Sequence, residues 1–355
     1  MYINSTEYLN DLDRLIEPQS EIFLPFNGKV ILVTGAAGLL ATFFIDIAMR
    51  LNAYYGGDIS ILAVDRNGEA LKERYESYLS SGKIELICGD VNDSQFVSKL
   101  SVKNFDYVLH AASNTSPVEY GADPVGTINT NVIGTYNLLE LIKNRSGVRF
   151  LFCSSVEMYG ANRGDVEDFN EDYSGYVDAN TVRAAYPSGK RAAESMCRAY
   201  MSQYGIDYVI ARIGRFFGPT VVLGDTKAPT QFMMNGVKNE DIVLKSDGSQ
   251  LFSWGYAGDC ATGFYWMFVK GLSGEAYNIA DPNGKLHLRE FAQFIANAAG
   301  TKCVFAQRSD AEEKGYSKIT HATLDTSKLT KLGWRAQFDI KGAIEKTLNY
   351  LRIKV

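Results

Sequence analysis

The sequence predicts an α/β fold: a doubly wound parallel sheet covered by helices on both faces, followed by a smaller α/β lobe. Short apolar runs alternate with runs of helical apolar spacing up to about residue 218, as is typical of parallel sheets buried on both faces. Beyond that point the alternation fades, and the loops become longer and richer in glycine. We expect an N-terminal arm at 1–28, a sheet domain at 29–218 and a smaller lobe at 219–355, with interleaved segments.

The elements follow one another in a regular order along the chain. A short amphipathic helix with apolar positions at Leu9, Leu12, Leu15 and Ile16 is expected in the arm. Short apolar runs predict buried strands at 29–35, 59–65, 83–90, 106–113, 148–155 and 207–214. Helical apolar spacing predicts helices between them at 39–57, 131–145 and 188–205.

Composition narrows the class of protein. Hydrophobic content of 46%, charged content of 22% and a net charge of −5 are those of a globular chain, and no basic patch indicates nucleic acid. The most apolar stretch, 39–55, carries Asp46 and Arg50 and is too short to span a bilayer. Scattered cysteines and histidines give no metal-site spacing, so we expect no metal. The scattered cysteines, together with a polar N-terminus that lacks a signal pattern, favour a reducing cytoplasm as the location.

The turn after the first strand, VTGAAGLLA, places Gly35 and Gly38 between that strand and the next helix. Glycine there permits a tight turn and close approach of a pyrophosphate, while the helix N-terminus offers free N–H groups. Ala41 replaces the third glycine of the usual fingerprint and is small enough for helix and strand to pack. Such a pattern also occurs in turns that bind nothing. As a functional signal it predicts a Rossmann dinucleotide site that includes Leu39 and Leu40.

Asp65 ends the second strand. A carboxylate at that point can accept hydrogen bonds from both ribose hydroxyls of adenosine. It would repel a 2′-phosphate, so NAD is favoured over NADP. Arg66 follows directly and keeps NADP as an alternative, and an ordinary turn residue is the other interpretation of Asp65.

Tyr186 and Lys190 stand four residues apart around Pro187, where a helix is expected to begin. Proline suits the first helical turn because its missing N–H would be unpaired there, and residues four apart share one face. A phenol alone is a poor base at neutral pH, whereas a nearby ammonium favours the phenolate. Tyr186 is therefore a candidate general base for a hydroxyl group, partnered by Lys190. The same spacing occurs by chance in surface pairs, but here it follows a dinucleotide loop and a strand ending in serines.

Together these motifs resemble the extended short-chain dehydrogenase/reductase family, specifically its NAD-dependent sugar-nucleotide epimerases, dehydratases and decarboxylases. The resemblance runs from about Gly28 to Leu351 and is carried by TGAAGLLA, CGDV, HAAS, TNVIGTYNLLE, CSSVEMYG, YPSGK, ARIGRFFGP, SDGSQLFSWGYAGDC, AYNIADPN and LGW. It implies that 29–218 is an NAD-binding Rossmann domain and 219–355 a substrate-binding lobe. NAD is the implied cofactor, and a nucleotide sugar is the implied partner.

The resemblance also implies roles for individual residues. Tyr186 would remove the proton of the sugar 4-hydroxyl while NAD takes the C4 hydride, with Lys190 as its partner. Ser155 matches the residue that hydrogen-bonds O4, and Glu157 matches the acid/base glutamate of dehydratases and glucuronate decarboxylases. In the alternative interpretation, Ser155 merely ends a strand and Glu157 caps a turn. Cofactor contacts are implied at Gly35, Gly38, Leu39, Leu40, Asp65, Arg66, Asp90, Val91, His110, Ala111, Ala112, Ser113, Asn129, Ser154, Tyr186, Lys190 and Ile213.

Three details of the resemblance concern the substrate. The loop with Ser116 and Pro117 resembles that of UDP-glucuronate decarboxylases. Arg183, three residues before Tyr186, gives a spacing that also occurs in those decarboxylases and in GDP-mannose 4,6-dehydratases. Val156 stands where dTDP-glucose 4,6-dehydratases carry an aspartic acid that protonates the leaving hydroxyl, and valine cannot donate a proton. Some dehydratases carry serine there, so dehydration is disfavoured rather than excluded.

Two positions depart from the family pattern. The family usually carries an arginine that grips the nucleotide diphosphate where this chain has Phe252. Conversely, Arg215 stands where the family normally shows asparagine. The guanidinium gained at position 215 could replace the one lost at position 252, because a guanidinium at either place could bind a phosphate in bidentate fashion. The alternative is that Arg215 is a surface residue. We expect Ser116, Pro117, Arg183, Arg215 and Phe252 to form the substrate site.

The expected activity is a redox-neutral conversion of a nucleotide sugar. The C4 position is oxidised transiently and the sugar is then decarboxylated or dehydrated, because Glu157 favours lyase chemistry over plain epimerisation. A 4-epimerase, a simple dehydrogenase/reductase and a non-catalytic NAD sensor remain the alternatives, and the acid/base set argues against the sensor. The resemblance further implies a homodimer formed through the helices at 131–144 and 188–201.

Overall fold

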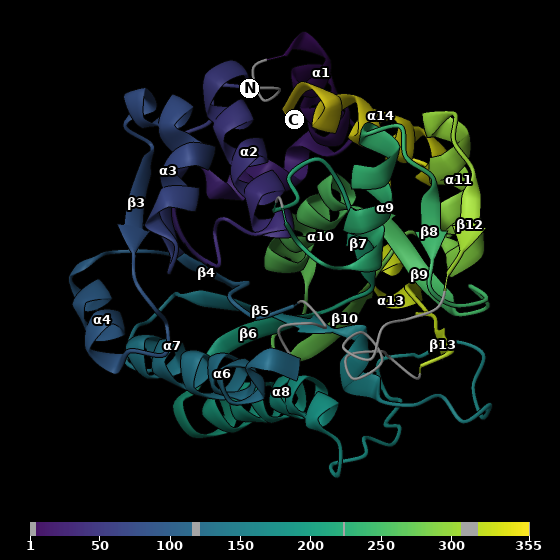
Figure 1. Cartoon of the computed structure of the whole chain (residues 1–355). Helices are drawn as coiled ribbons and strands as arrows, with labels where there is room; N and C mark the ends of the chain where they lie inside the picture. Colours follow the sequence, from purple (N-terminus) through teal and green to yellow (C-terminus); the bar gives the residue numbers. More distant parts are fainter. Residues whose placement is uncertain (1–4, 116–120, 223, 307–318, 355) are drawn as a thin grey trace.

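A seven-stranded parallel sheet forms the centre of the molecule in the computed structural model, which describes residues 5–115, 121–222, 224–306 and 319–354 (Figure 1). The strand order is β10-β6-β5-β4-β1-β2-β3, and every neighbouring pair is parallel. The predicted doubly wound parallel sheet is thereby confirmed. The strands are β1 (Val30–Thr34), β2 (Ser60–Asp65), β3 (Ile84–Cys88), β4 (Tyr107–His110), β5 (Arg149–Ser155), β6 (Asp207–Ile213) and β10 (Glu275–Ile279).

The strand order reverses direction between β1 and β4. From β1 the chain proceeds outward through β2 to β3, whereas β4 begins the opposite series through β5 and β6 to β10. Open α/β sheets bind ligands in the crevice outside the carboxyl ends of the strands at this switch point. The loops that follow β1, β2, β4 and β5 therefore border the place where a ligand is expected.

Helices cover both faces of the sheet (Figure 1). Side chains alternate across a strand, so both faces of β1 are apolar: Ile31 and Val33 belong to one apolar cluster and Leu32 belongs to the other. Helices on both faces bury these clusters. One face carries α2 (Leu39–Tyr54), α3 (Gly68–Tyr75) and α10 (Ala257–Lys270). The other carries α4 (Ser94–Lys99), α6 (Pro124–Asn129), α7 (Thr135–Ile142) and α8 (Ala185–Tyr204).

The N-terminal segment packs on the helix that follows the first strand. It forms α1 (Thr6–Ile16) and a 3₁₀ segment, η2 (Glu17–Phe26), and both contact other helices of that face. Tyr8 donates a hydrogen bond to Asp46 of α2 at 2.7 Å, and Tyr78 donates another at 3.0 Å. Burial raises the pKa of Asp46 to about 6. A buried carboxylate requires such donors, so the segment and α2 are held in register.

A smaller lobe follows β6. Its four-stranded sheet contains β7 (Arg215–Phe217), β9 (Leu251–Tyr256), β11 (Lys285–His287) and β13 (His321–Ala322), and β8 (Ile242–Leu244) pairs with β12 (Cys303–Phe305). Its helices are α9 (Ala228–Val237), α11 (Leu288–Ala299), α13 (Ser327–Lys331) and α14 (Ile340–Lys354). Trp254 stacks on Phe291 with ring centres 4.0 Å apart in its core. Between these elements the chain returns to the large sheet through α10 and β10, so the two parts interleave.

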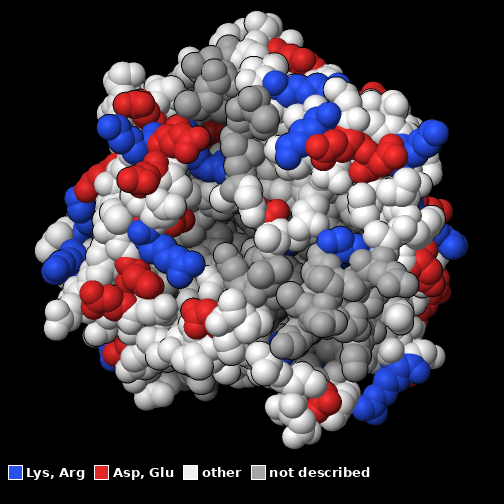
Figure 2. Space-filling view, in the orientation of Figure 1, with Lys and Arg blue, Asp and Glu red and all other residues white. Residues whose placement is uncertain are grey.

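Charged side chains of both signs are interspersed on the face seen in Figure 2. None of the helices in the described part of the chain has the length and apolar character needed to cross a membrane.

Candidate active site

The loop between β1 and α2 lies against the loop after β4. Gly35 has a φ of +66°, in the left-handed region that favours glycine. A Cβ atom on Gly35 would lie 2.6 Å from the backbone nitrogen of Ala112. Gly38 is the N-cap residue of α2, and Ala41 is 1% exposed. Backbone N–H groups at the start of the 16-residue helix α2 thus follow a glycine turn that packs closely on the loop after β4, an arrangement that suits a pyrophosphate.

Asp65 ends β2 beside this loop. Its Oδ2 atom accepts a hydrogen bond from the Ala37 N–H at 3.1 Å, and its Oδ1 atom accepts one from Asn67 at 3.0 Å. Arg66 donates to the Oδ1 atom of Asn114 at 3.2 Å. The predicted ribose-binding carboxylate is therefore oriented by the backbone of the phosphate loop. Asn114 is a neighbour that the sequence reasoning missed.

His110 is held inside the sheet. The structure places its Nδ1 atom 2.8 Å from the Thr34 hydroxyl and its Nε2 atom 3.2 Å from the Thr135 hydroxyl. Burial, with a smaller contribution from the Lys190 charge, lowers the pKa of His110 to about 3, so the imidazole is neutral at physiological pH. With both ring nitrogens engaged, its side chain ties β1, β4 and α7 together.

The predicted contacts after β3 and β4 are held by hydrogen bonds and by burial. Asp90 accepts a hydrogen bond from the Asn92 N–H at 2.8 Å, and Val91 is 4% exposed. Ser113 donates to the Oδ1 atom of Asn131 at 2.8 Å, and Asn131 is fully buried. Asn129, the predicted asparagine, ends α6 and is half-buried. Asn131 is thus a contact of a predicted site residue that sequence reasoning missed.

Tyr186 and Lys190 lie in the first turns of α8, and they are 5% and 2% exposed. The Lys190 Nζ atom donates to the carbonyl oxygen of Cys153 at 2.8 Å and lies 5.7 Å from the centre of the Tyr186 ring. It also lies 4.8 Å from the ring centre of Phe152. Burial lowers the pKa of Lys190 to about 8. The two residues therefore share one helix face, with an ammonium group beside the phenol.

The two serines that end β5 have different surroundings. Ser154 is 2% exposed and donates a hydrogen bond to Glu194, which forms an ion pair with Arg212 at 2.8 Å. Ser155 is half-buried, and its Oγ atom accepts a hydrogen bond from the Glu157 N–H at 3.3 Å. Ser154 thus anchors β5 to α8 and β6, and Ser155 is the last residue of β5, at the carboxyl end of the strand.

Glu157 and Arg183 form an ion pair that the sequence reasoning did not foresee. Glu157 lies in the 3₁₀ turn η6 (Val156–Tyr159) and Arg183 in the turn η7 (Val182–Ala184), directly before α8. One guanidinium nitrogen of Arg183 donates to the two carboxylate oxygens of Glu157 at 2.8 and 2.9 Å. The pair joins the end of β5 to the start of the helix that carries Tyr186.

Arg215 and Phe252 are in contact. The guanidinium carbon of Arg215 lies 3.8 Å from the centre of the Phe252 ring. The contact arises because β7 and β9 pair in parallel, with Arg215 opposite Trp254. Phe252 is 5% exposed, and Arg215 is half-buried. Ile213 ends the neighbouring strand β6, whereas Ser116 and Pro117 fall outside the described residues.

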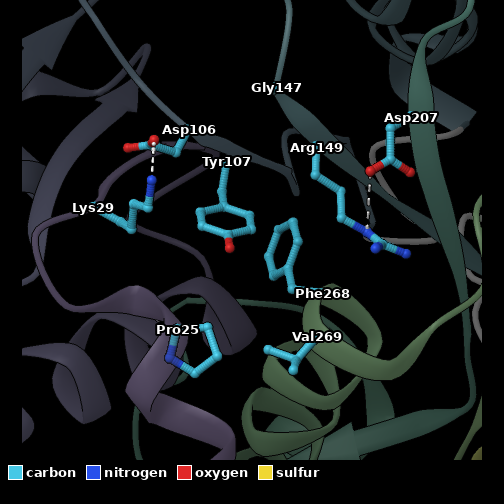
Figure 3. A pocket seen from close by; sticks show the side chains of 9 residues that line it. All are labelled: Pro25, Lys29, Asp106, Tyr107, Gly147, Arg149, Asp207, Phe268 and Val269. Carbon is cyan, nitrogen blue, oxygen red and sulfur yellow. Dashed lines mark hydrogen bonds and ion pairs between the residues drawn. The ribbon is translucent and has the colours of Figure 1, made fainter.

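A separate hollow of about 310 Å³ lies at the opposite edge of the sheet (Figure 3). It is bordered by residues at the amino ends of β1, β4, β5 and β6, including the ion pairs Lys29–Asp106 and Arg149–Asp207. This hollow does not include the residues predicted for the site. The described ranges contain no group of three or more His, Cys, Asp or Glu residues that could hold a metal.

Comparison with known proteins agrees with this geometry. The model of the NAD dependent epimerase/dehydratase family matches residues 31–280. UDP-glucuronic acid decarboxylase 1 of Danio rerio is 31% identical over 322 residues, which are 91% of this chain and 72% of that protein. UDP-glucuronic acid decarboxylase 6 of Arabidopsis thaliana is 32% identical over 265 residues, which are 75% of this chain and 73% of that protein.

Solved structures show the same fold. The UDP-glucuronic acid 4-epimerase from Bacillus cereus, in complex with UDP-glucuronic acid and NAD, has a TM-score of 0.78 at 20% identity, covering 92% of this chain and 100% of that one. The dTDP-glucose 4,6-dehydratase from Bacillus anthracis, in complex with NAD, has a TM-score of 0.76 at 20% identity, covering 91% and 96%. The resemblance expected from the motifs is confirmed, and the chain belongs to the NAD dependent epimerase/dehydratase family of enzymes.

Proposed function

We propose that this enzyme decarboxylates a nucleotide sugar that carries a C6 carboxylate, as the UDP-glucuronic acid decarboxylases among its relatives are named for doing. The observation that carries the proposal is the buried pair Tyr186–Lys190, whose phenol and ammonium lie together at the start of α8. Ser155 and Glu157, at the end of β5, complete the acid/base set. The enzyme class and the use of NAD follow from the family.

The turn at Gly35 fits NAD, because glycine lets this turn pack closely on the backbone of the loop after β4 and the N–H groups that begin α2 suit a pyrophosphate. Bound at that turn, NAD supplies the acceptor for the C4 hydride and later returns it. We infer that Gly38 and the first residues of α2 hold its phosphates and that Asp65 binds the adenosine ribose. The backbone of the loop after β4 packs against this turn.

Tyr186 is proposed to accept the proton of the sugar 4-hydroxyl, and Ser155 to hydrogen-bond O4. Lys190 favours the phenolate, since a nearby positive charge stabilises the anionic form. Oxidation at C4 turns the substrate into a β-keto acid. The C5–C6 bond then breaks, carbon dioxide leaves, and the bonding electrons move to the C4 oxygen as an enolate. C5 takes up a proton from solvent water, and Tyr186 returns its proton to O4 as the ketone is reduced.

Arg215 is proposed to bind the nucleotide diphosphate. The Phe252 ring covers one face of the guanidinium, which favours a fixed orientation through cation–π attraction. The N–H donors of a guanidinium lie in its plane, so stacking leaves its edge able to bind phosphate oxygens in bidentate fashion. The contact supports a compensating exchange at the two positions that depart from the family pattern.

The test is incubation with a panel of nucleotide sugars followed by mass spectrometry of the products. A mass loss equal to carbon dioxide from UDP-glucuronate, with NAD retained and no net NADH, is expected. A loss of water from a neutral sugar would replace the proposal with dehydration, and an unchanged mass with altered retention would replace it with epimerisation. Stoichiometric release of NADH would instead indicate a simple dehydrogenase.

We further propose that the enzyme works as a homodimer in the cytoplasm. Exposed apolar side chains on the helices of one face support the dimer: Val125, Ile128, Ile133, Tyr136 and Tyr204 are each at least 36% exposed. Buried free thiols at Cys153, Cys197 and Cys260 support a reducing compartment. Light scattering of the purified protein tests the dimer, and a mass equal to one chain would contradict it.

A further inference from the structure

Glu194 lies on the same helix as the proposed base and its partner. It follows Lys190 by four residues on α8, so the two side chains share one face of the helix. They are 8% and 2% exposed, so water screens the interaction between their charges little. An unpaired carboxylate at this position would attract the Lys190 ammonium along the helix, away from Tyr186.

The Glu194 carboxylate is engaged by donors on two strands. Arg212 on β6 donates from its Nε atom to both carboxylate oxygens at 3.2 Å and from a second nitrogen to one of them at 2.8 Å. Ser154 on β5 donates to the Oε1 atom. Lys190 donates instead to the Cys153 carbonyl oxygen, and no described carboxylate forms an ion pair with it. The pairing with Arg212 therefore withholds Glu194 from Lys190.

Arg212 is fixed by further contacts. Its guanidinium donates to the Tyr159 hydroxyl at 3.0 Å and to the Glu171 carbonyl oxygen at 2.6 Å, and its carbon lies 4.9 Å from the centre of the Tyr159 ring. The side chains of Arg212 and Glu194 are 11% and 9% exposed. Because arginine keeps its charge in proteins, the charge of Glu194 stays compensated as the pH changes. Lys190 is therefore exposed to two opposite charges whose effects oppose each other.

The titratable groups that face Lys190 from the sheet are neutral near pH 8. His110 on β4 is uncharged because burial, with a smaller contribution from the Lys190 charge, lowers its pKa to about 3. Cys153 on β5 is a thiol because burial raises its pKa to about 12. The segments α6 and η5 (Thr130–Gly134), which pack against α8, contain no charged side chain. On α7, Glu140 meets α8 at Tyr200, well beyond Lys190.

The charged groups on α8 and on the turns next to it have other partners. Glu157 on η6 pairs with Arg183 on η7. Arg191 on α8 donates to backbone carbonyl oxygens that include two in η6. Burial lowers the pKa of Lys190 to about 8, and nearby side chains, Glu194 among them, oppose that effect. The balance between Glu194 and its partner on β6 therefore acts directly on the ammonium.

We propose that Glu194 and Arg212 are positioning residues for the reaction: by pairing with each other they leave the Lys190 ammonium beside Tyr186 and hold it as a cation at the working pH. The inference rests on the proposed function, in which Lys190 acts on the Tyr186 phenol. Each member of the pair has a separate effect. Arg212 prevents Glu194 from drawing the ammonium away, and Glu194 prevents the positive charge of Arg212 from repelling it.

The experiment measures the titration of Lys190 in the NAD-loaded protein by nuclear magnetic resonance with carbon-13-labelled lysine. Lys190→Met, which lacks the signal, identifies it. Glu194→Gln leaves Arg212 uncompensated and should lower the pKa of Lys190 by about one pH unit. Arg212→Met leaves Glu194 unpaired and should raise that pKa by about as much. The alkaline limb of carbon dioxide release from UDP-glucuronate should move with the pKa, to lower pH in the first variant and to higher pH in the second.

A double variant separates charge from structure. Glu194→Gln combined with Arg212→Met removes both charges, so the pKa of Lys190 should return close to that of the parent. The double variant leaves no uncompensated buried charge and should be more stable than either single variant. The comparison with the parent therefore stands even if one single variant is unstable.

A matched ion pair provides the control. Arg50 on α2 donates to both carboxylate oxygens of Asp13, at 2.7 and 2.6 Å. The helix α2 covers the face of the sheet opposite to α8 (Figure 1). Arg50→Met and Asp13→Asn should leave the pKa of Lys190 unchanged.

The inference is overturned if the two single variants leave the pKa of Lys190 unchanged or shift it in the same direction, or if the double variant stays as displaced as a single one. These outcomes are distinct from failure of the proposed function, because the titration requires no turnover. If the unmodified enzyme releases no carbon dioxide from UDP-glucuronate, the decarboxylation is wrong whatever the titrations show. If it does release carbon dioxide while the single variants titrate as the parent does, only the positioning role is wrong.

Discussion

The Lys190 Nζ atom lies 5.7 Å from the centre of the Tyr186 ring while it donates a hydrogen bond to the Cys153 carbonyl oxygen at 2.8 Å. That hydrogen bond fixes the ammonium on the β5 side of α8 and keeps a positive charge beside the phenol. Because the charge is buried, water screens it little. The proposed chemistry depends on this relationship more than on any other.

Tyr186→Phe should abolish turnover and preserve the fold. The substitution removes only the phenolic oxygen from a side chain that is 5% exposed, so its packing is retained. Loss of a general base typically lowers the rate by about 10²–10⁴-fold. Carbon dioxide release from UDP-glucuronate measures the effect, with thermal unfolding as the check on the fold. Turnover within a few-fold of the parent would contradict the role of Tyr186.

The rate should fall as the pH rises above about 8, because burial lowers the pKa of Lys190 to about 8 and the cation is lost there.

The contribution of Lys190 to stability should change in the opposite direction as the pH rises. The pKa of Lys190 in the folded chain lies below its ordinary 10.5, so the unfolded chain binds more protons between those values. The contribution of Lys190 to the free energy of unfolding therefore rises with pH across that window.

Rate profiles and thermal melts over the same pH range separate the two effects. A decline in rate that accompanies a decline in stability would assign the alkaline limb to unfolding rather than to Lys190. Lys190→Met, which has no charge to lose, should show a low rate without this limb. If the variant keeps the limb, another group is responsible for it.

Gly35→Ala should abolish retention of NAD. The new Cβ atom would lie 2.6 Å from the Ala112 nitrogen, where the loops after β1 and β4 are in contact, so one of the two loops would have to move. Gly56 provides a matched control, since its φ of +68° is similar and a Cβ there would meet no atom within 4 Å. Both variants carry the left-handed backbone penalty of about 1 kcal/mol, so a difference in NAD bound after purification reports the steric contact alone. Equal retention would contradict the assignment of this turn to NAD binding.

The parts of the site that sequence reasoning anticipated are those set by local patterns. An apolar run that ends in glycine predicts where β1 stops and α2 starts, and the structure has Thr34 ending β1 and Leu39 beginning α2. Proline at the start of a helical pattern likewise predicts the beginning of α8 and the shared face of Tyr186 and Lys190. Such features depend on a few neighbouring residues, so a single sequence contains them.

The parts that were missed depend on long-range or irregular geometry. The ion pair of Arg183 with Glu157 joins residues 26 apart in the chain, and no spacing rule connects them. Asn131, rather than Asn129, faces Ser113 within a π-helical turn between α6 and α7. A π turn shifts the face that each residue presents relative to a regular helix. A buried polar series at Thr127, Asn131 and Thr135 was the available signal.

Arg215→Ala should weaken binding of UDP by about tenfold to a hundredfold, because a bidentate guanidinium–phosphate contact would be lost. Phe252→Leu should weaken it only a few-fold, since the ring acts by holding the guanidinium, whose carbon lies 3.8 Å from the ring centre. In the Arg215→Ala background, Phe252→Leu should have almost no further effect. Calorimetry with UDP on all four proteins gives the coupling between the two side chains.

Lys328→Met serves as the control for loss of a positive charge, because Lys328 lies in α13 and pairs with Glu275 of β10 at 2.6 Å. Its affinity for UDP should equal that of the parent. A double variant tests the exchange more strictly. Arg215→Asn combined with Phe252→Arg recreates the pattern usual in the family and should recover part of the affinity for UDP that Arg215→Asn alone loses. Unchanged UDP binding after Arg215→Ala would show that the diphosphate is held elsewhere, and the stack on Phe252 would then serve only to join β7 to β9.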